Sequence, residues 1–183
     1  MTRLIIDDHW PADANLWIVP CLNPGGFEKS TRENEEGVDL NRDYKSQASS
    51  RVRSHIVWLD DQPSFDLALL LHEDWESNGF YLYELNPDSQ PSLAEVITRA
   101  VAQVCPIDWA AEIEGRAASG GMIRFVGEIP ERPEWPEALW LLERKTRHNY
   151  TLEAPSDFPL ELRSEALGIA VKTAIHTLHS EEP

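Results

Sequence analysis

Two arginines stand close together in a polar, glycine-bearing stretch, TRENEEGVDLNRDY, which runs from Thr31 to Tyr44. Neither Arg32 nor Arg42 follows an apolar periodic pattern, so neither is typical of a charge on a helix face. The planar guanidinium fork suits carboxylates, and Asn41 stands beside the second arginine. The stretch indicates a loop that binds an anion, although pairing with the chain's own acidic residues would explain either arginine alone.

Two further polar residues end apolar runs, His72 in FDLALLLHED and Glu153 in YTLEAP. A neutral imidazole binds zinc and titrates near neutrality, so His72 is a candidate metal ligand or general base. A partly desolvated Glu153 is a candidate general base. Each also has a structural alternative, a histidine bonded to a loop carbonyl and a glutamate that closes a loop or pairs with a cation. With the two arginines they are consistent with one hydrolytic site.

Composition limits the class of protein. With 183 residues, of which 42% are hydrophobic, the chain is expected to form a single domain with its own core. Its net charge of -16 repels phosphate backbones and anionic membranes, so neither nucleic acid nor a membrane is an expected partner. Cys21 and Cys105 lack C-x-x-C spacing, which favours a reducing, cytoplasmic setting. The start, MTRLIIDDHW, is typical of neither a signal peptide nor a membrane span.

The predicted elements alternate between strands and helices. Strands are predicted at Leu16–Val19, Leu67–Leu71 and Met122–Val126, and helices from Ser92, with a capping box to Glu95, and from about Leu162 to Leu178. The stretch Asp108–Leu139 is rich in glycine, proline and charge and is predicted to run over the surface. This alternation predicts an α/β architecture, in which ligand sites lie beyond the carboxyl ends of the strands. His72 and Glu153 occupy such positions.

Four phrases carry a family resemblance. They are NPGGF (Asn23 to Phe27), TRENEEGVDLNRDY, LLLHEDWESNGFYLYELN and YTLEAPSDFPLELR, and they span most of the chain in this order. In them the chain resembles the zinc carboxypeptidases of the carboxypeptidase A type, which have succinylglutamate desuccinylase and aspartoacylase relatives. The resemblance is closest to bacterial metallocarboxypeptidase-like proteins. It implies an α/β/α sandwich with a mixed, mostly parallel sheet covered by helices, forming one catalytic domain over residues 1–183.

The resemblance also implies roles for the candidate residues. One zinc ion would be bound by His72, and the Glu153 carboxylate would activate the zinc-bound water. Arg32 would polarise the scissile carbonyl and stabilise the oxyanion, while Asn41 and Arg42 would hold the terminal carboxylate of the substrate. The function expected is zinc-dependent hydrolysis of a peptide or amide bond next to a free carboxylate, with a peptide or an acyl-amino acid as substrate.

The sequence departs from the family where two more zinc ligands are expected. The family carries an early His-x-x-Glu motif before its Asn-Pro turn, and none precedes Asn23 here; His9 has Ala12 in place of the glutamate. The His179 to Glu182 pair lies at the C-terminal end of a predicted helix and is rejected as the motif. We therefore expect an N-terminally incomplete domain, weak or no zinc binding, and an uncovered sheet edge through which the chain could self-associate.

Two alternatives to a carboxypeptidase stay open. An N-acyl amino-acid deacylase would use the same DLNR phrase and strand-end glutamate. A catalytically inactive domain would keep the carboxylate-binding arginines and bind no metal, as the missing His-x-x-Glu motif suggests.

Overall fold

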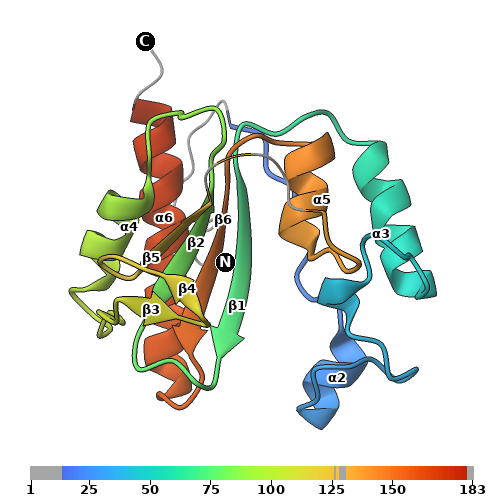
Figure 1. Cartoon of the computed structure of the whole chain (residues 1–183), viewed down its shortest axis with the longest axis horizontal. Coiled ribbons are helices and arrows are strands. Elements are labelled where there is room, and N and C mark those ends of the chain that lie inside the picture. Colours follow the sequence, from blue (N-terminus) through green and yellow to red (C-terminus); the bar gives the residue numbers. More distant parts are fainter. Residues whose placement is uncertain (1–13, 126, 128–130, 181–183) are drawn as a thin grey trace. The chain divides into compact units, whose positions relative to one another are not determined.

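The computed structural model describes residues 14–125, 127 and 131–180 (Figure 1). The chain divides into two compact units, and each is described by itself. Of the described residues, unit 1 contains 14, 68–125, 127 and 148–180, and unit 2 contains 15–67 and 131–147. The organisation as a single domain stays a prediction.

Unit 1 is built on a four-stranded sheet in the order β1-β6-β2-β5. Its strands are β1 (Ala68–Asp74), β2 (Tyr81–Leu85), β5 (Met122–Phe125) and β6 (Asn149–Pro155). Strand β6 is parallel to β1 and antiparallel to β2, and β2 is parallel to β5. The sheet is therefore mixed and mostly parallel, which confirms the expected α/β fold class. The strands predicted at Leu67–Leu71 and Met122–Val126 are confirmed as β1 and β5, although residue 126 lies outside the described residues.

Strand β6 lies inside the sheet, and all 7 of its residues are buried. The strands on both sides pair with its backbone N–H and C=O groups, so the whole strand can be buried without leaving these groups unsatisfied. Alternate side chains point to opposite faces of the sheet. Tyr150 and Leu152 therefore belong to one face, and Thr151 and Glu153 to the other.

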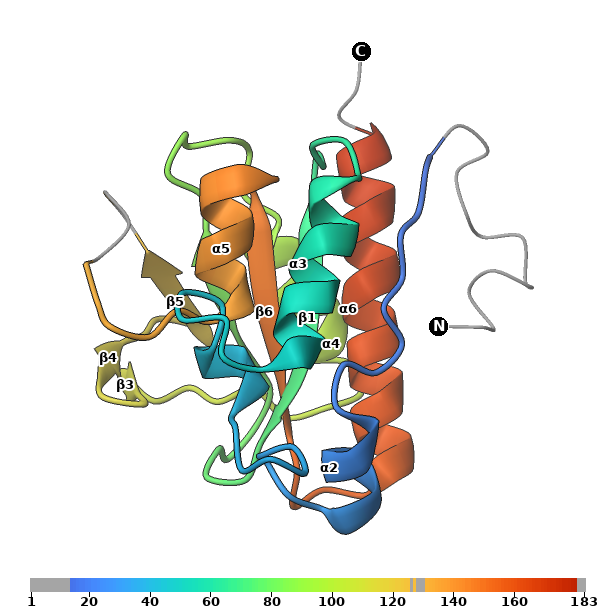
Figure 2. The ribbon, with the colours of Figure 1, turned by 90° about the vertical axis from the view of Figure 1, so that its right-hand side faces the viewer.

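Helices α4 (Ala94–Val101) and α6 (Leu160–Ser180) pack against each other on one face of the sheet (Figures 1 and 2). Both predicted helices are confirmed, and α6 extends past its predicted bounds at both ends. Ser92 lies just before α4, where its hydroxyl accepts the N–H of Ala94 at 3.2 Å and donates to Glu95 Oε2 at 3.2 Å. No helix in the described part of the chain is long and apolar enough to cross a membrane.

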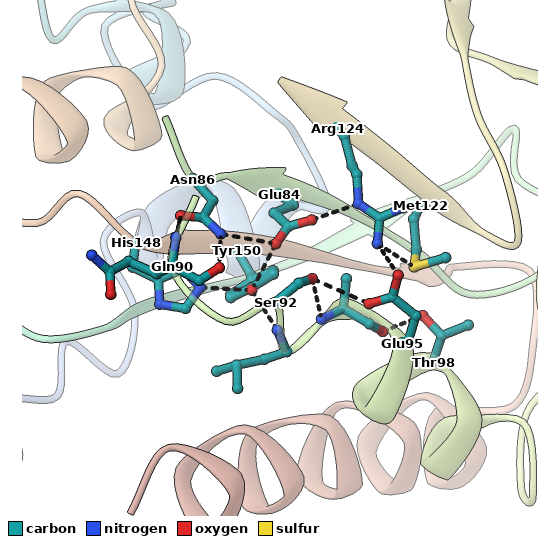
Figure 3. A network of polar contacts seen from close by, with 12 residues as sticks. Glu84, Asn86, Gln90, Ser92, Glu95, Thr98, Met122, Arg124, His148 and Tyr150 are labelled. Carbon is teal, nitrogen blue, oxygen red and sulfur yellow. Dashed lines mark hydrogen bonds and ion pairs between the residues drawn. The ribbon is translucent and has the colours of Figure 1, made fainter. Parts of the chain in front are cut away.

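A polar network joins the sheet to α4 (Figure 3). The Glu84 carboxylate, whose side chain is 4% exposed, accepts hydrogen bonds from Arg124 Nε at 2.7 Å and from the Tyr150 hydroxyl at 3.0 Å. Arg124 also pairs with Glu95 on α4. Burial raises the pKa of Glu84, but the hydrogen bonds from Ser92, Arg124 and Tyr150 outweigh it and leave the pKa below its ordinary value. The carboxylate therefore stays ionised at neutral pH.

We expect the Arg124→Met substitution to lower the free energy of unfolding at pH 7 by about 2 kcal/mol, because it leaves the buried Glu84 carboxylate without its cation. A carboxyl group whose pKa is lower in the folded state than in the unfolded state stabilises the fold at pH values above its unfolded pKa, which is about 4.3 for glutamate. This stabilisation is lost as the pH falls through the folded pKa. The loss should therefore shrink below about pH 4. Urea unfolding at pH 7 and pH 3 measures this, with Arg99→Met on the exposed side of α4 as control. An equal loss at both values would contradict it.

Unit 2 contains short helices that the sequence did not predict. They are α2 (Pro24–Lys29), the 3-10 helix η1 (Leu40–Arg42), α3 (Ser50–Asp60) and α5 (Glu137–Arg144). In α3, the buried residues Val52, Ile56 and Leu59 are spaced four and three apart, which is the repeat of a helix face. Arg51 and Arg53, which flank Val52, obscured this repeat in the sequence.

The stretch Asp108–Leu139 contains more regular structure than the predicted surface excursions. In unit 1 it forms a hairpin of β3 (Glu112–Ile113) and β4 (Arg116–Ala117), and Ile113 packs with Tyr81 and Ile123 in a buried cluster. In unit 2 it enters α5, where Leu139 is buried. Hairpins and helix starts rich in proline and charge are hard to tell from loops by composition alone.

The strand predicted at Leu16–Val19 is wrong, because these residues have no regular secondary structure. Trp17 Nε1 donates to Gln62 Oε1 at 2.7 Å, and its ring lies 5.4 Å from that of Phe65. Leu16, Trp17 and Val19 are 40%, 38% and 43% exposed. An apolar run forms a strand only when a neighbouring strand hydrogen-bonds to its backbone N–H and C=O groups. The described residues of unit 2 form no strand that could do so.

Strand β1 lies at one edge of the described sheet. Leu71 on this strand is 41% exposed, although it belongs to an apolar run. Edge strands present backbone groups that can pair with another chain. Self-association through this edge stays a prediction.

Candidate functional site

His72 and Glu153 are brought together by the pairing of β1 with β6, in which their Cα atoms are direct partners. Direct partners on neighbouring strands project from the same face of a sheet. His72 Nδ1 lies 4.0 Å from Glu153 Oε1, and the side chains are 30% and 12% exposed. The structure thus places an imidazole beside a largely buried carboxylate, at the carboxyl end of two parallel strands.

Tyr81 extends this row, because it is the direct partner of Glu153 on the other side of β6. Its hydroxyl donates to Asp74 Oδ2 at 3.1 Å, at the end of β1. Burial, and after it the charge of Glu153, raises the pKa of Tyr81 above its ordinary value. The phenol therefore stays protonated beside Glu153. The sequence could not place Tyr81 beside Glu153, because only the pairing register of β2 with β6 brings the two residues together.

The arginine loop belongs to unit 2 and is organised by Asp39. Asp39 Oδ2 accepts Arg32 Nε at 2.6 Å, and Asp39 Oδ1 accepts the backbone N–H of Asn41 at 3.0 Å. The second bond caps η1, which carries Asn41 and Arg42. The loop therefore brings Arg32 close to the Asn41–Arg42 pair through one carboxylate.

The Asn-Pro turn is tied to the same loop. Asn23 caps α2 by accepting the N–H of Gly26 at 3.0 Å, and its Nδ2 donates to the carbonyl oxygen of Arg32 at 3.2 Å. A Cβ at Gly26 would lie 2.8 Å from the carbonyl oxygen of Thr31 and 2.2 Å from Asn23 Nδ2. Only glycine allows this close approach. The NPGG phrase and the arginine loop therefore form one local structure.

Asn41 has a structural contact that the sequence did not predict. Its Oδ1 accepts the backbone N–H of Glu137, the first residue of α5, at 3.1 Å. An amide whose oxygen is engaged in this way is oriented, and its Nδ2 group is the end that can donate to an anion. The geometry is compatible with carboxylate binding by Asn41, and that role stays a prediction.

A largely buried polar group in unit 2 includes Glu137, whose backbone N–H binds Asn41. The Tyr44 hydroxyl is 2.7 Å from His55 Nδ1, which is 3.9 Å from Glu137 Oε1. Burial raises the pKa of Glu137 to about 7, although a hydrogen bond from Tyr44 opposes the shift. Burial lowers the pKa of His55. Because Glu137 follows a proline-rich stretch far from Tyr44 in sequence, residue spacing could not have identified this group.

The described residues do not form a complete zinc site. Catalytic zinc ordinarily has three protein ligands and one open position. His72 and Glu153 supply one imidazole and one carboxylate, and no group of three His, Cys, Asp or Glu side chains that could hold a metal ion occurs in the described part of the chain. His9 and Glu182 lie outside that part, while His179 lies in the last turn of α6.

No protein-family model matches the chain, and no curated protein matches it. Several solved structures are similar to the chain. A candidate metallopeptidase of Shewanella amazonensis is 24% identical with a TM-score of 0.70, covering 87% of this chain and 62% of that one. One of Shewanella denitrificans is 21% identical with a TM-score of 0.69, covering 86% and 58%. A metallo-carboxypeptidase of Burkholderia cenocepacia is 20% identical with a TM-score of 0.52, covering 89% and 44%.

The chain spans 58% to 62% of the length of the two Shewanella structures. At identities of 20% to 24% the similarity concerns the fold. It agrees with the mixed, mostly parallel sheet and its covering helices. The chain therefore has the fold that these metallopeptidase and metallo-carboxypeptidase structures share.

Proposed function

We propose that the chain is a metallocarboxypeptidase-type hydrolase domain that acts on a peptide or amide bond next to a free carboxylate. The observation that carries this proposal is the direct pairing of His72 with Glu153 on adjacent parallel strands. The fold shared with metallopeptidase structures supports it. The substrate class proposed is a peptide or an acyl-amino acid.

In this proposal Glu153 is the general base. Its carboxylate is 12% exposed, so it can accept a proton from an attacking water molecule in a largely dry environment. Arg32 would stabilise the negative charge that develops on the carbonyl oxygen, since fixed cationic donors act most strongly where charge appears in the transition state. Asn41 and Arg42 would bind the carboxylate of the substrate through charge-assisted hydrogen bonds.

A zinc ion is part of the proposal, with His72 as one ligand. The described residues supply too few donors for it, so further ligands would have to come from outside them. We assign no step of the reaction to the metal for this reason. The base, the arginine and the carboxylate clamp are properties of the chain's own side chains.

A second candidate is a carboxylate-binding domain without turnover. The observation that favours it is the incomplete set of metal ligands in the described residues. This candidate keeps the loop of Arg32, Asn41 and Arg42 and predicts binding of a free carboxylate. It predicts no hydrolysis at any zinc concentration.

Zinc uptake separates the two candidates. The hydrolase proposal predicts one zinc ion per folded chain and loss of this binding in the His72→Ala variant. The matched control is His176→Ala, since His176 is exposed on α6. Titration of metal-free protein with zinc and a competing chelator measures stoichiometry and affinity. Failure of the folded protein to take up zinc, or equal uptake by His72→Ala, would count against the hydrolase and favour the second candidate.

A further inference from the structure

The carboxylate of Asp39 connects the residues proposed to meet the substrate. One oxygen accepts Arg32 Nε at 2.6 Å, and the other accepts the backbone N–H of Asn41 at 3.0 Å. The Asp39 side chain is 23% exposed, whereas that of Arg32 is 61% exposed. The less exposed Asp39 carboxylate therefore holds the more exposed Arg32 guanidinium in place.

We propose that Asp39 is a positioning residue for binding an N-acyl amino acid. It sets the guanidinium of Arg32, which would meet the acyl carbonyl oxygen, in a fixed relation to the turn of Asn41 and Arg42, which would hold the carboxylate. The inference rests on the proposed function of these three residues. Asp39 itself does not touch the ligand. It acts through Arg32 on one side and through the η1 turn on the other.

The physical reason is the cost of ordering a long side chain. Arginine has a large rotamer entropy, part of which is lost when its side chain is fixed on a ligand. The bond from Arg32 Nε to Asp39 orders the side chain before the ligand arrives. The backbone of Arg32 is held as well, because Asn23 Nδ2 donates to its carbonyl oxygen at 3.2 Å.

Positioning by Asp39 and simple electrostatics predict opposite changes in ligand affinity when the charge of Asp39 is removed. Asp39 carries a negative charge close to the place where an anion would bind, so its removal should strengthen binding on electrostatic grounds alone. If positioning dominates, removal of the charge should weaken binding. The direction of the change therefore decides between the two effects.

The Asp39→Asn variant isolates the contact to Arg32. Asparagine caps a helix as well as aspartate does, so its Oδ1 can still accept the N–H of Asn41. Its other atom becomes an N–H donor, which cannot accept a hydrogen bond from Arg32 Nε. The turn of η1 is kept, and the link between Asp39 and Arg32 is lost.

Glu36→Gln is the matched control. Glu36 lies in the same loop and is exposed, and its backbone N–H is bound by Asn34 Oδ1 at 3.0 Å. The substitution removes one negative charge from the loop and leaves that backbone contact in place. We expect it to bind the ligand as tightly as the unchanged protein, or slightly more tightly.

The experiment is calorimetric titration of the full chain and both variants with N-benzoylglycine. We expect Asp39→Asn to weaken binding about fivefold, while Glu36→Gln does not weaken it. Equal or tighter binding by Asp39→Asn would overturn the role of Asp39 alone. A failure of the unchanged protein to bind would overturn the proposed carboxylate clamp, and the role of Asp39 with it.

A double-mutant cycle distinguishes positioning from general damage to the loop. If Asp39 acts through Arg32, Asp39→Asn should no longer weaken binding in a chain that already carries Arg32→Ala. Melting temperatures of the four proteins show whether each is folded. A loss of binding that is the same with and without Arg32 would contradict the proposal, because it would come from the turn rather than from the arginine.

Discussion

The Glu153→Gln variant is expected to lose about a thousandfold in kcat for hydrolysis of N-benzoylglycyl-phenylalanine while keeping its fold. General bases contribute on the order of 10² to 10⁴ to such reactions, and glutamine cannot accept the proton. Its side chain has nearly the same shape as glutamate, so the buried position in β6 can hold it. Steady-state rates and circular dichroism of both proteins measure the two expectations.

Glu73→Gln is the control for this variant. Glu73 lies next to His72 on β1 but projects from the opposite face, where it pairs with Arg163 Nη1 at 2.5 Å. Its removal should leave the rate within a few fold of the unchanged protein, roughly as for surface substitutions away from a site. A Glu153→Gln protein that retains full activity would exclude Glu153 as the base.

The two arginines should differ in the kinetic constant that they control. Arg32→Ala is expected to lower kcat about a hundredfold, because a donor aimed at developing charge acts in the transition state. Arg42→Ala is expected to raise KM with little change in kcat, because binding of the substrate carboxylate is the same in the ground state and the transition state. Initial rates over a range of substrate concentrations separate the two constants.

Arg99→Ala serves as the control for charge, since Arg99 lies on the exposed side of α4 in unit 1. It removes one positive charge from the chain and should leave kcat and KM unchanged. The assignment of roles would be contradicted if Arg32→Ala raised only KM, or if Arg42→Ala lowered kcat without affecting KM.

The parts of the fold that the sequence predicted are those with strong local patterns. The apolar run that becomes β1 and the helix that becomes α6 are each recognisable from their own residues. The run at Leu16–Val19 has an equally apolar composition, yet it forms no strand. Composition records the preference of a segment, whereas a strand also requires a partner, which is a property of the rest of the fold.

The contacts of the candidate site likewise include some that the sequence could predict and some that it could not. His72 and Glu153 could be proposed from their positions at strand ends, and their register on β1 and β6 brings them together. Asp39 could have been found from the sequence, since an aspartate two residues before Asn41 fits the cap of a short helix. The contact of Asn41 with Glu137 could not, because it joins residues 96 positions apart.

The most direct test compares the hydrolysis of N-benzoylglycyl-phenylalanine with that of its C-terminal amide by the zinc-supplemented protein. A site that binds a free carboxylate through Asn41 and Arg42 should cleave the acid at least about a hundredfold faster, because the amide leaves the cationic donors unpaired. Chelation of zinc should stop the reaction. Cleavage of neither compound, or of both at equal rates, would contradict a carboxylate-directed hydrolase.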